Sequence, residues 1–585
     1  MLAERSRTAL FVWRDQFNRF VSCLIYTPRD RFDTALRRRF IALLEEGFNG
    51  RLSGFATGLG ESHLVRLQVT IDLAPETARN VVDTAALEKK LIDAARGWDD
   101  GFVDALMALY DPEEGRRLRT RYGEAFPAIY RTTVPPERAA ADIAALEAVQ
   151  GERPIAISLH ALPGQPASVQ LRLFHRDAPL ALSDVLPRLE NMGLRIISEV
   201  PYPVAPQNAA PVWISELQAE SRDGSPIALD LIAAPFIAAF HKLWDGELED
   251  DRFNQHVLHL GLDWREVSLL RAYAKYLQQA RFTPTPSFIR DTLASHANLA
   301  SLFIKLFHAQ FDPLLQKESS TVIAGLLVEI DHALESVTSL AEDEVLRRYV
   351  NLIRSTLRTN YYQTDEQGQP KPYIALKLDS QALTDLPLPR PLVEIWVYSP
   401  RVEGVHLRGG RVARGGIRWS DRRDDFRTEV LGLMKAQQVK NSVIVPVGSK
   451  GGFYCKHLPT DRSAEQKEVI ACYQTFIRGL LDVTDNRVGD GVMTPKNVVR
   501  RDGDDPYLVV AADKGTAKFS DIANAISLAY GFWLGDAFAS GGSAGYDHKH
   551  MGITARGAWE AVKRHFRELG TDIQSQSFTC VGVGD

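Results

Sequence analysis

The chain of 585 residues has only four cysteines, and their spacing excludes a disulfide framework or a zinc module. Cys23, Cys455, Cys472 and Cys580 lie far apart and form no CxxC pair. Secreted disulfide-rich domains and zinc sites use cysteines at short, regular spacings. Reduced thiols are therefore expected, and they favour a cytoplasmic location.

The sequence also lacks a hydrophobic run long enough to cross a bilayer. The most apolar stretch, Leu231–Phe240, lies between two polar residues and contains Pro235. A spanning helix needs about 20 apolar residues, so this stretch is far too short. The N-terminal segment has basic residues but no uninterrupted apolar core, so no secretory signal is expected either. We expect a protein without a membrane contact.

Neither sign of charge is in clear excess. Lys and Arg number 69 against 74 Asp and Glu, a formal net charge of −5, which is too balanced to indicate a polyanionic partner. The RGG triplets at Arg408 and Arg414 lie between predicted strands, unlike a disordered RNA-binding tract. Nucleic acid is therefore not an expected partner.

What is present is an ordinary globular composition, with 45% hydrophobic and 24% charged residues. The length allows about four domains of about 150 residues each. Near the N-terminus, the pattern predicts a strand at Phe20–Tyr26, a helix over Pro28–Phe48 and an alternating strand at Leu64–Ile71. We interpret this region as a small βαββ module with an antiparallel sheet.

A similar pattern returns further along the chain, which indicates a second, related module. Its predicted elements are a strand at Val169–Phe174, a helix at Ser183–Met192 closed by Gly193, and strands at Leu194–Val200 and Val212–Gln218. Helix-forming residues fill the segment between the modules and the region from 227 to about 361. The longer predicted helices there are Trp264–Ala280, Ser287–His308 and Ala324–Arg358.

A domain of another kind is predicted from about Pro372. Strands and helices alternate in it, which is typical of an α/β domain. The predicted strands are Tyr373–Leu378, Leu392–Tyr398 and Ser442–Val447, and the predicted helices are Asp424–Gln438, Gln466–Leu481 and Ser520–Phe538.

The last residues predict the opening of a dinucleotide-binding fold. A helix over Thr554–Leu569, ended by Gly570, precedes an apolar run, Ser577–Val583, that favours a buried strand. Gly582 and Gly584 then supply the first two glycines of a GxGxxG motif, whose remainder would lie beyond Asp585. We expect the chain to stop inside this domain.

Two glycine-rich, cationic segments are the strongest candidates for chemistry. One runs from Arg408 to Arg427 and the other from Gln437 to Lys456. Glycine lets an anion approach the backbone closely and the cations attract it, so a dicarboxylate would fit. Lys450 is expected at the end of a strand, where a lysine crowded by other cations has a lowered pKa and can exchange protons. The residues alone leave open that these segments are only solvated turns.

The segments ARGGIRWS and VKNSVIVPVGSKGG resemble the substrate domain of the glutamate and amino-acid dehydrogenases. PVGSKGGF, the large upstream region and the paired modules are similar to the large NAD-specific glutamate dehydrogenases, whose N-terminal part carries ACT-type domains. The resemblance implies an α+β and α/β multidomain chain. Its implied parts are ACT-like modules at 1–80 and 151–222, a helical linker at 81–150, a helical region at 223–365, the substrate domain at 366–575 and the truncated start of a Rossmann-type domain at 576–585.

The resemblance also implies roles for single residues. Lys450 matches the catalytic lysine, which acts through an attacking water, and Asp513 matches the catalytic aspartate, a proton carrier. Lys440 matches the lysine that holds the substrate α-carboxylate. Arg414 and Gly416 take the substrate-binding places around GGIR, with arginine where smaller members have lysine for the distal carboxylate. Val447 replaces the first glycine of GGxKGG, which departs from those members.

Cofactor contacts are implied near the C-terminus. Thr554 matches a residue that contacts the nicotinamide amide, although a threonine there also suits a helix N-cap. Gly582 and Gly584 would turn the chain under the pyrophosphate of NAD. His548 and His550 form an HxH without further ligands at a recognised spacing, so no metal site is expected.

The function implied is NAD-dependent oxidative deamination of L-glutamate to 2-oxoglutarate and ammonia. The resemblance also implies a homo-oligomer and an amino-acid effector at the ACT-like modules. Two alternatives stay open: an amino-acid-binding regulatory fragment without turnover, and a related dehydrogenase that acts on another amino acid.

Overall fold

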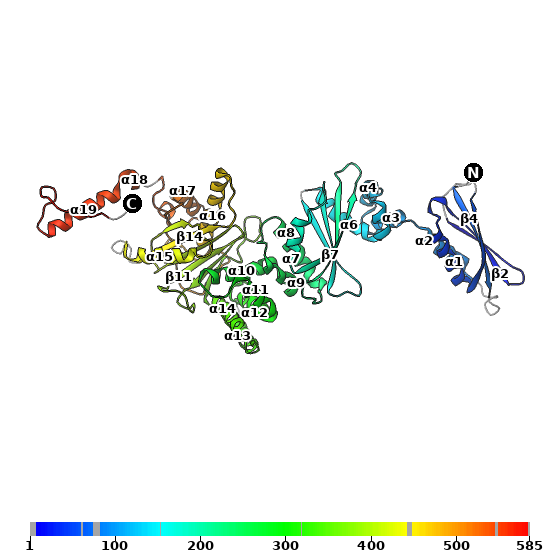
Figure 1. The fold of residues 1–585 in the computed structure, drawn as a ribbon, viewed down its shortest axis with the longest axis horizontal. Coiled ribbons are helices and arrows are strands. Elements are labelled where there is room, and N and C mark those ends of the chain that lie inside the picture. Colours follow the sequence, from blue (N-terminus) through cyan, green and yellow to red (C-terminus); the bar gives the residue numbers. More distant parts are fainter. Residues whose placement is uncertain are drawn as a thin grey trace. The chain divides into compact units, whose positions relative to one another are not determined.

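The computed structural model describes residues 8–59, 63–73, 82–151, 154–316, 319–440, 447–516, 518–543 and 548–582. The side chains of residues 59, 438–440, 548 and 549 lie outside this description. The chain forms two compact units (Figure 1). The first comprises Met1–His160, Gln170–Leu182 and Ile197–Gln218, and the second comprises Ala161–Val169, Ser183–Ile196 and Ala219–Asp585.

The N-terminal module is a four-stranded antiparallel sheet with helices on one face. Its sheet has the order β1-β2-β4-β3, and Phe40 and Leu44 of the first helix are buried against it. Asp33 caps that helix by accepting a hydrogen bond from the backbone N–H of Leu36. The elements are β1 (Ala9–Arg14), β2 (Phe20–Pro28), α1 (Thr34–Phe48), β3 (Gly50–Leu59), β4 (Leu64–Leu73) and α2 (Thr84–Ala95).

The second module repeats this topology, with the order β5-β6-β8-β7. Gly193, with φ of +93°, ends its helix as predicted. The βαββ interpretation was incomplete, because each module begins with an additional strand, β1 or β5. The elements are β5 (Ile155–Ala161), β6 (Ser168–Arg176), α7 (Leu182–Asn191), β7 (Leu194–Val204) and β8 (Val212–Ser221).

Helices connect and follow the modules, as predicted, but two of them are shorter than predicted. The segment 287–308 belongs to two helices that meet at His296, and the segment 324–358 contains two helices followed by a strand. The helices are α3 (Trp98–Leu109), α4 (Pro112–Tyr122), α5 (Ala128–Thr133), α6 (Pro136–Gln150), α8 (Leu229–Trp244), α9 (Gln255–Leu260), α10 (Trp264–Gln279), α11 (Pro286–Ser295), α12 (Ala297–Phe311), α13 (Ser319–Glu335) and α14 (Leu340–Ser355).

A seven-stranded mixed sheet forms the centre of the second unit. Its order is β17-β13-β14-β12-β11-β10-β9; β13 is parallel to both β14 and β17, and the other pairs are antiparallel. The sheet begins at β9, before the predicted boundary at 366. Its strands are β9 (Thr356–Thr359), β10 (Ile374–Asp379), β11 (Val393–Tyr398), β12 (Val402–Arg408), β13 (Gly416–Trp419), β14 (Ser449–Cys455) and β17 (Ala511–Ala512).

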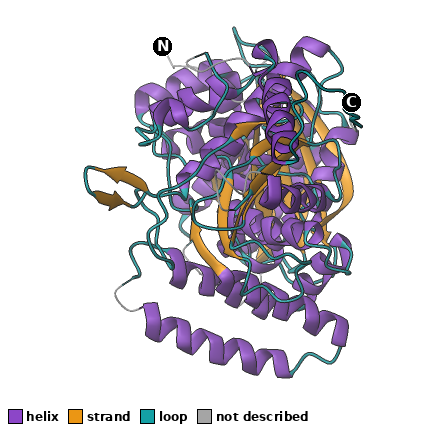
Figure 2. Ribbon diagram, turned by 90° about the vertical axis from the view of Figure 1, so that its left-hand side faces the viewer, coloured by secondary structure: helices purple, strands orange, loops and turns teal. Residues whose placement is uncertain are grey.

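Helices cover both faces of this sheet (Figure 2). A Cβ atom on Gly452 would lie 2.5 Å from Val430 of α15, and one on Gly404 would lie 2.4 Å from Phe476 of α16. These glycines project to opposite faces, since Gly404 pairs with Phe453. The remaining elements are α15 (Phe426–Lys440), α16 (Arg462–Asp482), β15 (Asn486–Val488), β16 (Gly491–Met493), α17 (Ser520–Ala529), α18 (His548–Met551) and α19 (Ile553–Glu568).

Two predictions for the last third of the chain need correction. The helix predicted over Ser520–Phe538 ends at Ala529. The run Ser577–Val583 was predicted to be a buried strand, but residues 577–582 form no strand and Val581 is 89% exposed. A strand requires a neighbour with which to pair, and no described residue pairs with this run.

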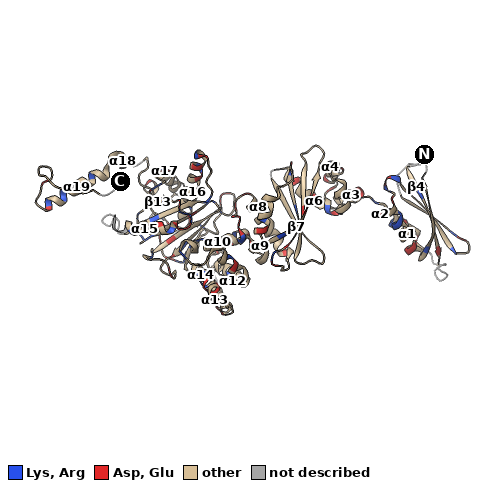
Figure 3. Cartoon of the chain, in the orientation of Figure 1, with Lys and Arg blue, Asp and Glu red and all other residues tan. Residues whose placement is uncertain are grey.

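Charges of both signs are interspersed along the chain (Figure 3). Among the described residues, no helix is long and apolar enough to span a bilayer.

Candidate active site

Lys450 lies within a central strand of the sheet. It is the second residue of β14, not the residue after a strand as predicted, and β14 runs between β13 and β12. Its side chain is only 9% exposed and forms an ion pair with the carboxylate of Asp513. Cations were expected around this lysine, but an anion, Asp513, contacts it. The two predicted catalytic residues are therefore in direct contact.

Asp513 immediately follows the edge strand β17, and its carboxylate accepts from two cations. Arg418 of β13 donates to it through Nε at 3.2 Å, in addition to the contact with Lys450. Burial acts to raise the pKa of Asp513, but the hydrogen bond and charge of Lys450, followed by contacts to Lys514 and Arg418, hold it below its ordinary value. Asp513 is therefore an ionised carboxylate at neutral pH.

Arg418 and the residues that hold it were not among the predicted site residues. Arg418 Nη1 donates to Glu429 of α15 at 3.0 Å, and Ser420 donates its hydroxyl to the other oxygen of Glu429 at 2.7 Å. The guanidinium thus bridges Glu429 and Asp513, which fixes its plane. Arg418 was visible in the motif GGIRWS, but nothing in the sequence connects Glu429 to it.

Two adjacent glycines bring the strands of the site together. A Cβ atom on Gly416 would lie 2.8 Å from the carbonyl oxygen of Ala512, and one on Gly415 would lie 1.5 Å from that of Ser449. Both contacts are with backbone, which cannot rotate away. Gly416 therefore permits the close approach of β13 to β17, the strand that immediately precedes Asp513.

Arg414 lies beside the same strands. Its carbonyl accepts a hydrogen bond from the N–H of Ser449 at 3.0 Å, and its guanidinium donates to Ser540 Oγ at 3.0 Å. The backbone of Arg414 is thus hydrogen-bonded to Ser449, the residue that precedes Lys450. A guanidinium has five N–H donors, so the contact with Ser540 leaves donors for a carboxylate.

The remaining predicted site residues are not brought to this cluster by any described contact. Lys440 is the last residue of α15, and its side chain lies outside the described residues, as does most of the strand predicted at Ser442–Val447. Thr554 is exposed in the first turn of α19, whose N-cap is Gly552, so the N-cap alternative for Thr554 is wrong. Gly582 is exposed, and Gly584 lies outside the described residues.

The residues predicted to contact the cofactor do not form a dinucleotide-binding site in the described part of the chain. Nothing in the described chain lies within 4 Å of a Cβ atom placed on Gly582, so no packing within the described protein requires glycine there. In a dinucleotide fold, a strand leads through a glycine turn into a helix whose N-terminus binds the pyrophosphate. Residues 577–582 do not form that strand. The described part of 553–582 therefore does not form a cradle for NAD.

The described residues contain no group of three His, Cys, Asp or Glu side chains placed to hold a metal ion. They do form a cavity of about 690 Å³ beside Lys371, Asp482 and Tyr530. None of the predicted site residues lines it. The predicted catalytic pair is therefore not in this cavity.

A buried histidine two residues before the end of β12 makes the stability of the second unit sensitive to pH. Burial, reinforced by the charge of Arg408, lowers the pKa of His406 from 6.5 to about 3. Neither ring nitrogen has a hydrogen-bond partner among the described residues. Between these pH values the unfolded chain binds a proton that the folded chain does not bind, so stability falls as the pH falls.

We expect His406→Leu to reduce this dependence by about 1.4 kcal/mol per pH unit between pH 6 and pH 4. Urea denaturation of both forms at several pH values in this range measures it. His457→Leu, at an exposed position, is the control and should leave the slope unchanged. Equal slopes for the parent and His406→Leu would show that His406 is not titrating in this way.

Five protein-family models match successive parts of the chain. The bacterial NAD-glutamate dehydrogenase catalytic domain matches residues 329–585. The glutamate dehydrogenase ACT2 and ACT3 domains match 9–99 and 154–232. Helical motifs 2 and 3 of glutamate dehydrogenase match 105–149 and 248–313. The two ACT-type modules and the helical segments are thus confirmed as parts of one known arrangement.

Similar proteins include three named NAD-specific glutamate dehydrogenase. The one from Halomonas elongata is 51% identical over 587 residues, and the one from Pseudomonas aeruginosa is 46% identical over 591. The one from Mycobacterium tuberculosis is 45% identical over 615 residues. Each match covers 100% of this chain but only 36 to 37% of the relative. The chain therefore spans little more than a third of their length.

The family models match in the same order as the modules, helices and mixed sheet, and these identities extend over the whole chain. Over its whole length the chain is therefore similar to a part of the bacterial NAD-specific glutamate dehydrogenases that includes their ACT-type modules, helical motifs and catalytic domain.

Proposed function

We propose that this chain carries the glutamate-binding and proton-transfer part of an NAD-dependent glutamate dehydrogenase. The reaction converts L-glutamate to 2-oxoglutarate and ammonia. The observation that supports this most directly is the ion pair of the buried Lys450 with Asp513, next to the backbone of Arg414. An acid and a base in contact, beside a cation that can hold a carboxylate, are the groups that deamination needs.

In this proposal each residue acts at a definite point. The Arg414 guanidinium binds the distal carboxylate of glutamate, and Lys440 binds the α-carboxylate. Lys450 positions and polarises the water that attacks the iminium carbon, and Asp513 accepts and returns protons during loss of ammonia. Gly416 keeps β13 close enough to β17 for Asp513 to reach Lys450.

NAD as the hydride acceptor is proposed from the family relationship. Thr554, Gly582 and Gly584 are its proposed contacts in this chain, although the described residues form no cradle, so no step is derived through the cofactor. L-glutamate and 2-oxoglutarate are the proposed substrate and product. An amino-acid effector at the ACT-type modules and a homo-oligomer remain predictions.

Substitution of Arg414 tests the specificity part of the proposal. In the full polypeptide, we expect Arg414→Leu to lower kcat/KM for glutamate about 100-fold, because a carboxylate would lose its charged hydrogen-bond donor. L-norvaline has no distal carboxylate, so its kcat/KM should change little. Steady-state NADH formation with both substrates measures the effect.

The exposed Arg411 provides the matched control. Arg411→Leu removes the same charge from the same loop and should leave both substrates unaffected. An equal loss for glutamate and norvaline in Arg414→Leu would argue against a distal-carboxylate contact. Binding of glutamate without any NADH formation by the unsubstituted polypeptide would instead favour a regulatory amino-acid-binding protein.

A further inference from the structure

Three cations lie side by side on the face of the sheet that Lys450 does not use. Arg358 of β9 pairs directly with Lys377 of β10, and the strand registers place Arg408 of β12 on the same face. Lys450 projects to the opposite face, because its neighbour Ser449 is the residue paired with Arg408. All three cations are at most 3% exposed. Such buried charges require partners.

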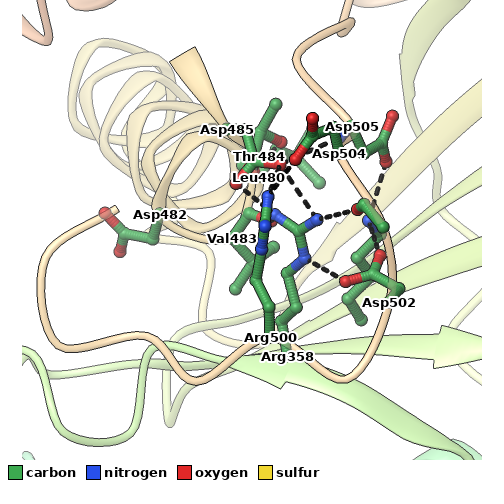
Figure 4. A network of polar contacts seen from close by, with 12 residues as sticks. Arg358, Leu480, Asp482, Val483, Thr484, Asp485, Arg500, Asp502, Asp504 and Asp505 are labelled. Atoms are coloured by element: carbon green, nitrogen blue, oxygen red, sulfur yellow. Dashed lines mark hydrogen bonds and ion pairs between the residues drawn. The ribbon is translucent and has the colours of Figure 1, made fainter. Parts of the chain in front are cut away.

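The partners come from the long segment between Lys450 and Asp513. Arg358 donates to both carboxylate oxygens of Asp485, at 2.7 and 3.0 Å, and to Asp502 at 2.6 Å (Figure 4). Asp505 accepts from Lys377 at 2.7 Å and also from Arg408. We call these six residues the clamp.

The clamp holds main chain as well as side chains. Arg358 Nη2 donates to the carbonyl of Gly503 at 2.8 Å, and Arg408 donates to that of Tyr507. The N–H of Asp505 donates to Asp485 at 2.8 Å. Residues 502–507 are therefore fixed on the sheet by several bonds and lack the freedom of an ordinary surface loop.

This fixed segment leads directly into β17 and Asp513. β17 has only two residues and is an edge strand, paired with β13 alone in the sheet. Two residue pairs provide little stabilisation by themselves. The position of Asp513 therefore depends on the chain on both sides of it: on the preceding segment, and on Thr516, which accepts from the N–H of Asp513 at 3.1 Å and donates to the carbonyl of Ile417 at 2.7 Å. A displacement of about 1 Å at a reacting group can reduce a rate about 100-fold.

We propose that the clamp positions Asp513 against Lys450, through the main chain of 505–513, and that Asp505 is its principal residue. The six clamp residues are positioning residues, since they contact neither Lys450 nor Asp513 in the described contacts. The proposal rests on the proposed catalytic role of Asp513, and it extends the functional part of the chain to the opposite face of the sheet.

The test is Asp505→Asn in the full polypeptide, which keeps the shape of the side chain and removes its charge. We expect kcat for glutamate to fall about 100-fold. The acid limb of the pH–kcat profile should move to higher pH, because Asp513 would lose part of its pairing. The charged groups that face Asp513 are Lys450 on β14 and Arg418 on β13, the latter bound to Glu429 on α15.

Asp504→Asn is the matched control. Asp504 is the neighbouring residue, 59% exposed, and itself contacts no clamp residue; its partner Arg500 also contacts Asp485 at 3.3 Å. We expect it to leave kcat and the pH profile unchanged. Acid unfolding of a destabilised variant would also move this limb, so circular dichroism at each pH must show that the variant is folded across the limb before the shift is assigned to positioning.

Asp502→Asn is the second variant, because Arg358 would keep its two bonds to Asp485. If Asp505→Asn does not fold, the pH limb of Asp502→Asn decides the question. A folded variant with an unshifted limb overturns the proposal, and so does failure of both variants to fold, because the clamp would then serve stability alone. If Lys450→Ala stays active, the proposed function itself fails; if it is inactive while Asp505→Asn is normal, only the positioning role fails.

Discussion

Lys450→Ala is expected to reduce kcat for glutamate oxidation about 1000-fold in the full polypeptide. General acid–base groups commonly contribute between about 100-fold and 10,000-fold, and this lysine has the added task of orienting the attacking water. Folding should be preserved, because alanine is tolerated in a strand and Arg418 continues to pair with Asp513 at 3.2 Å. NADH formation measured at saturating glutamate and NAD gives the result.

Lys467→Ala is the control for this experiment. Lys467 is an exposed residue of α16 and is not among the proposed site residues. Its loss should therefore not change kcat. Circular dichroism and thermal unfolding of both variants check that the fold is retained. A kcat for Lys450→Ala within tenfold of the parent would remove this lysine from the catalytic group.

Gly415→Ala is expected to destabilise the second unit by more than about 4 kcal/mol. The new Cβ atom would lie 1.5 Å from the carbonyl oxygen of Ser449, so β13 and β14 would have to separate. That separation would displace Lys450, the residue after Ser449, and activity should be lost together with stability. Urea denaturation followed by tryptophan fluorescence measures the free energy of unfolding.

The matched control is Gly432→Ala in α15. A Cβ atom at Gly432 meets nothing within 4 Å, and the residue lies inside a helix. Alanine should therefore stabilise this helix by about 0.5–1 kcal/mol. If Gly415→Ala were as stable as Gly432→Ala, the two strands would be further apart than described.

The elements that the sequence predicted correctly are those with a strong local pattern. α10, α16 and β11 have apolar residues at the helical or strand period, and their bounds differ little from the prediction. β1 was missed, although its side chains alternate in burial, because its outward positions carry the large apolar residues Phe11 and Trp13. β9 was assigned to a helix because it follows α14 without a break in the chain.

Residues of the candidate site could be predicted only where they belong to a short, recognisable sequence motif. Arg414, Gly416 and Lys450 are recognisable from GGIR and SKGG, and Asp513 from its own segment. The pairing of Lys450 with Asp513 was not visible, because it depends on the parallel pairing of β13 with both β14 and β17. The clamp was not visible for the same reason: opposite charges far apart in a sequence have no pattern that joins them.

The order of strands in the sheet has a consequence for synthesis of the protein on the ribosome. β9, β10, β11 and β12 are neighbours both in the sheet and along the chain, so this meander can pair as soon as it emerges. β14 must then insert between β12 and β13, and β17 is added last at the edge. Until residue 513 has been translated, the carboxylate of Asp513 cannot join Lys450 and Arg418, although Arg418 can already pair with Glu429. The nascent chain therefore passes through a stage in which the edge of β13 that later pairs with β17 is exposed, at which a chaperone that binds exposed sheet edges would have its greatest effect.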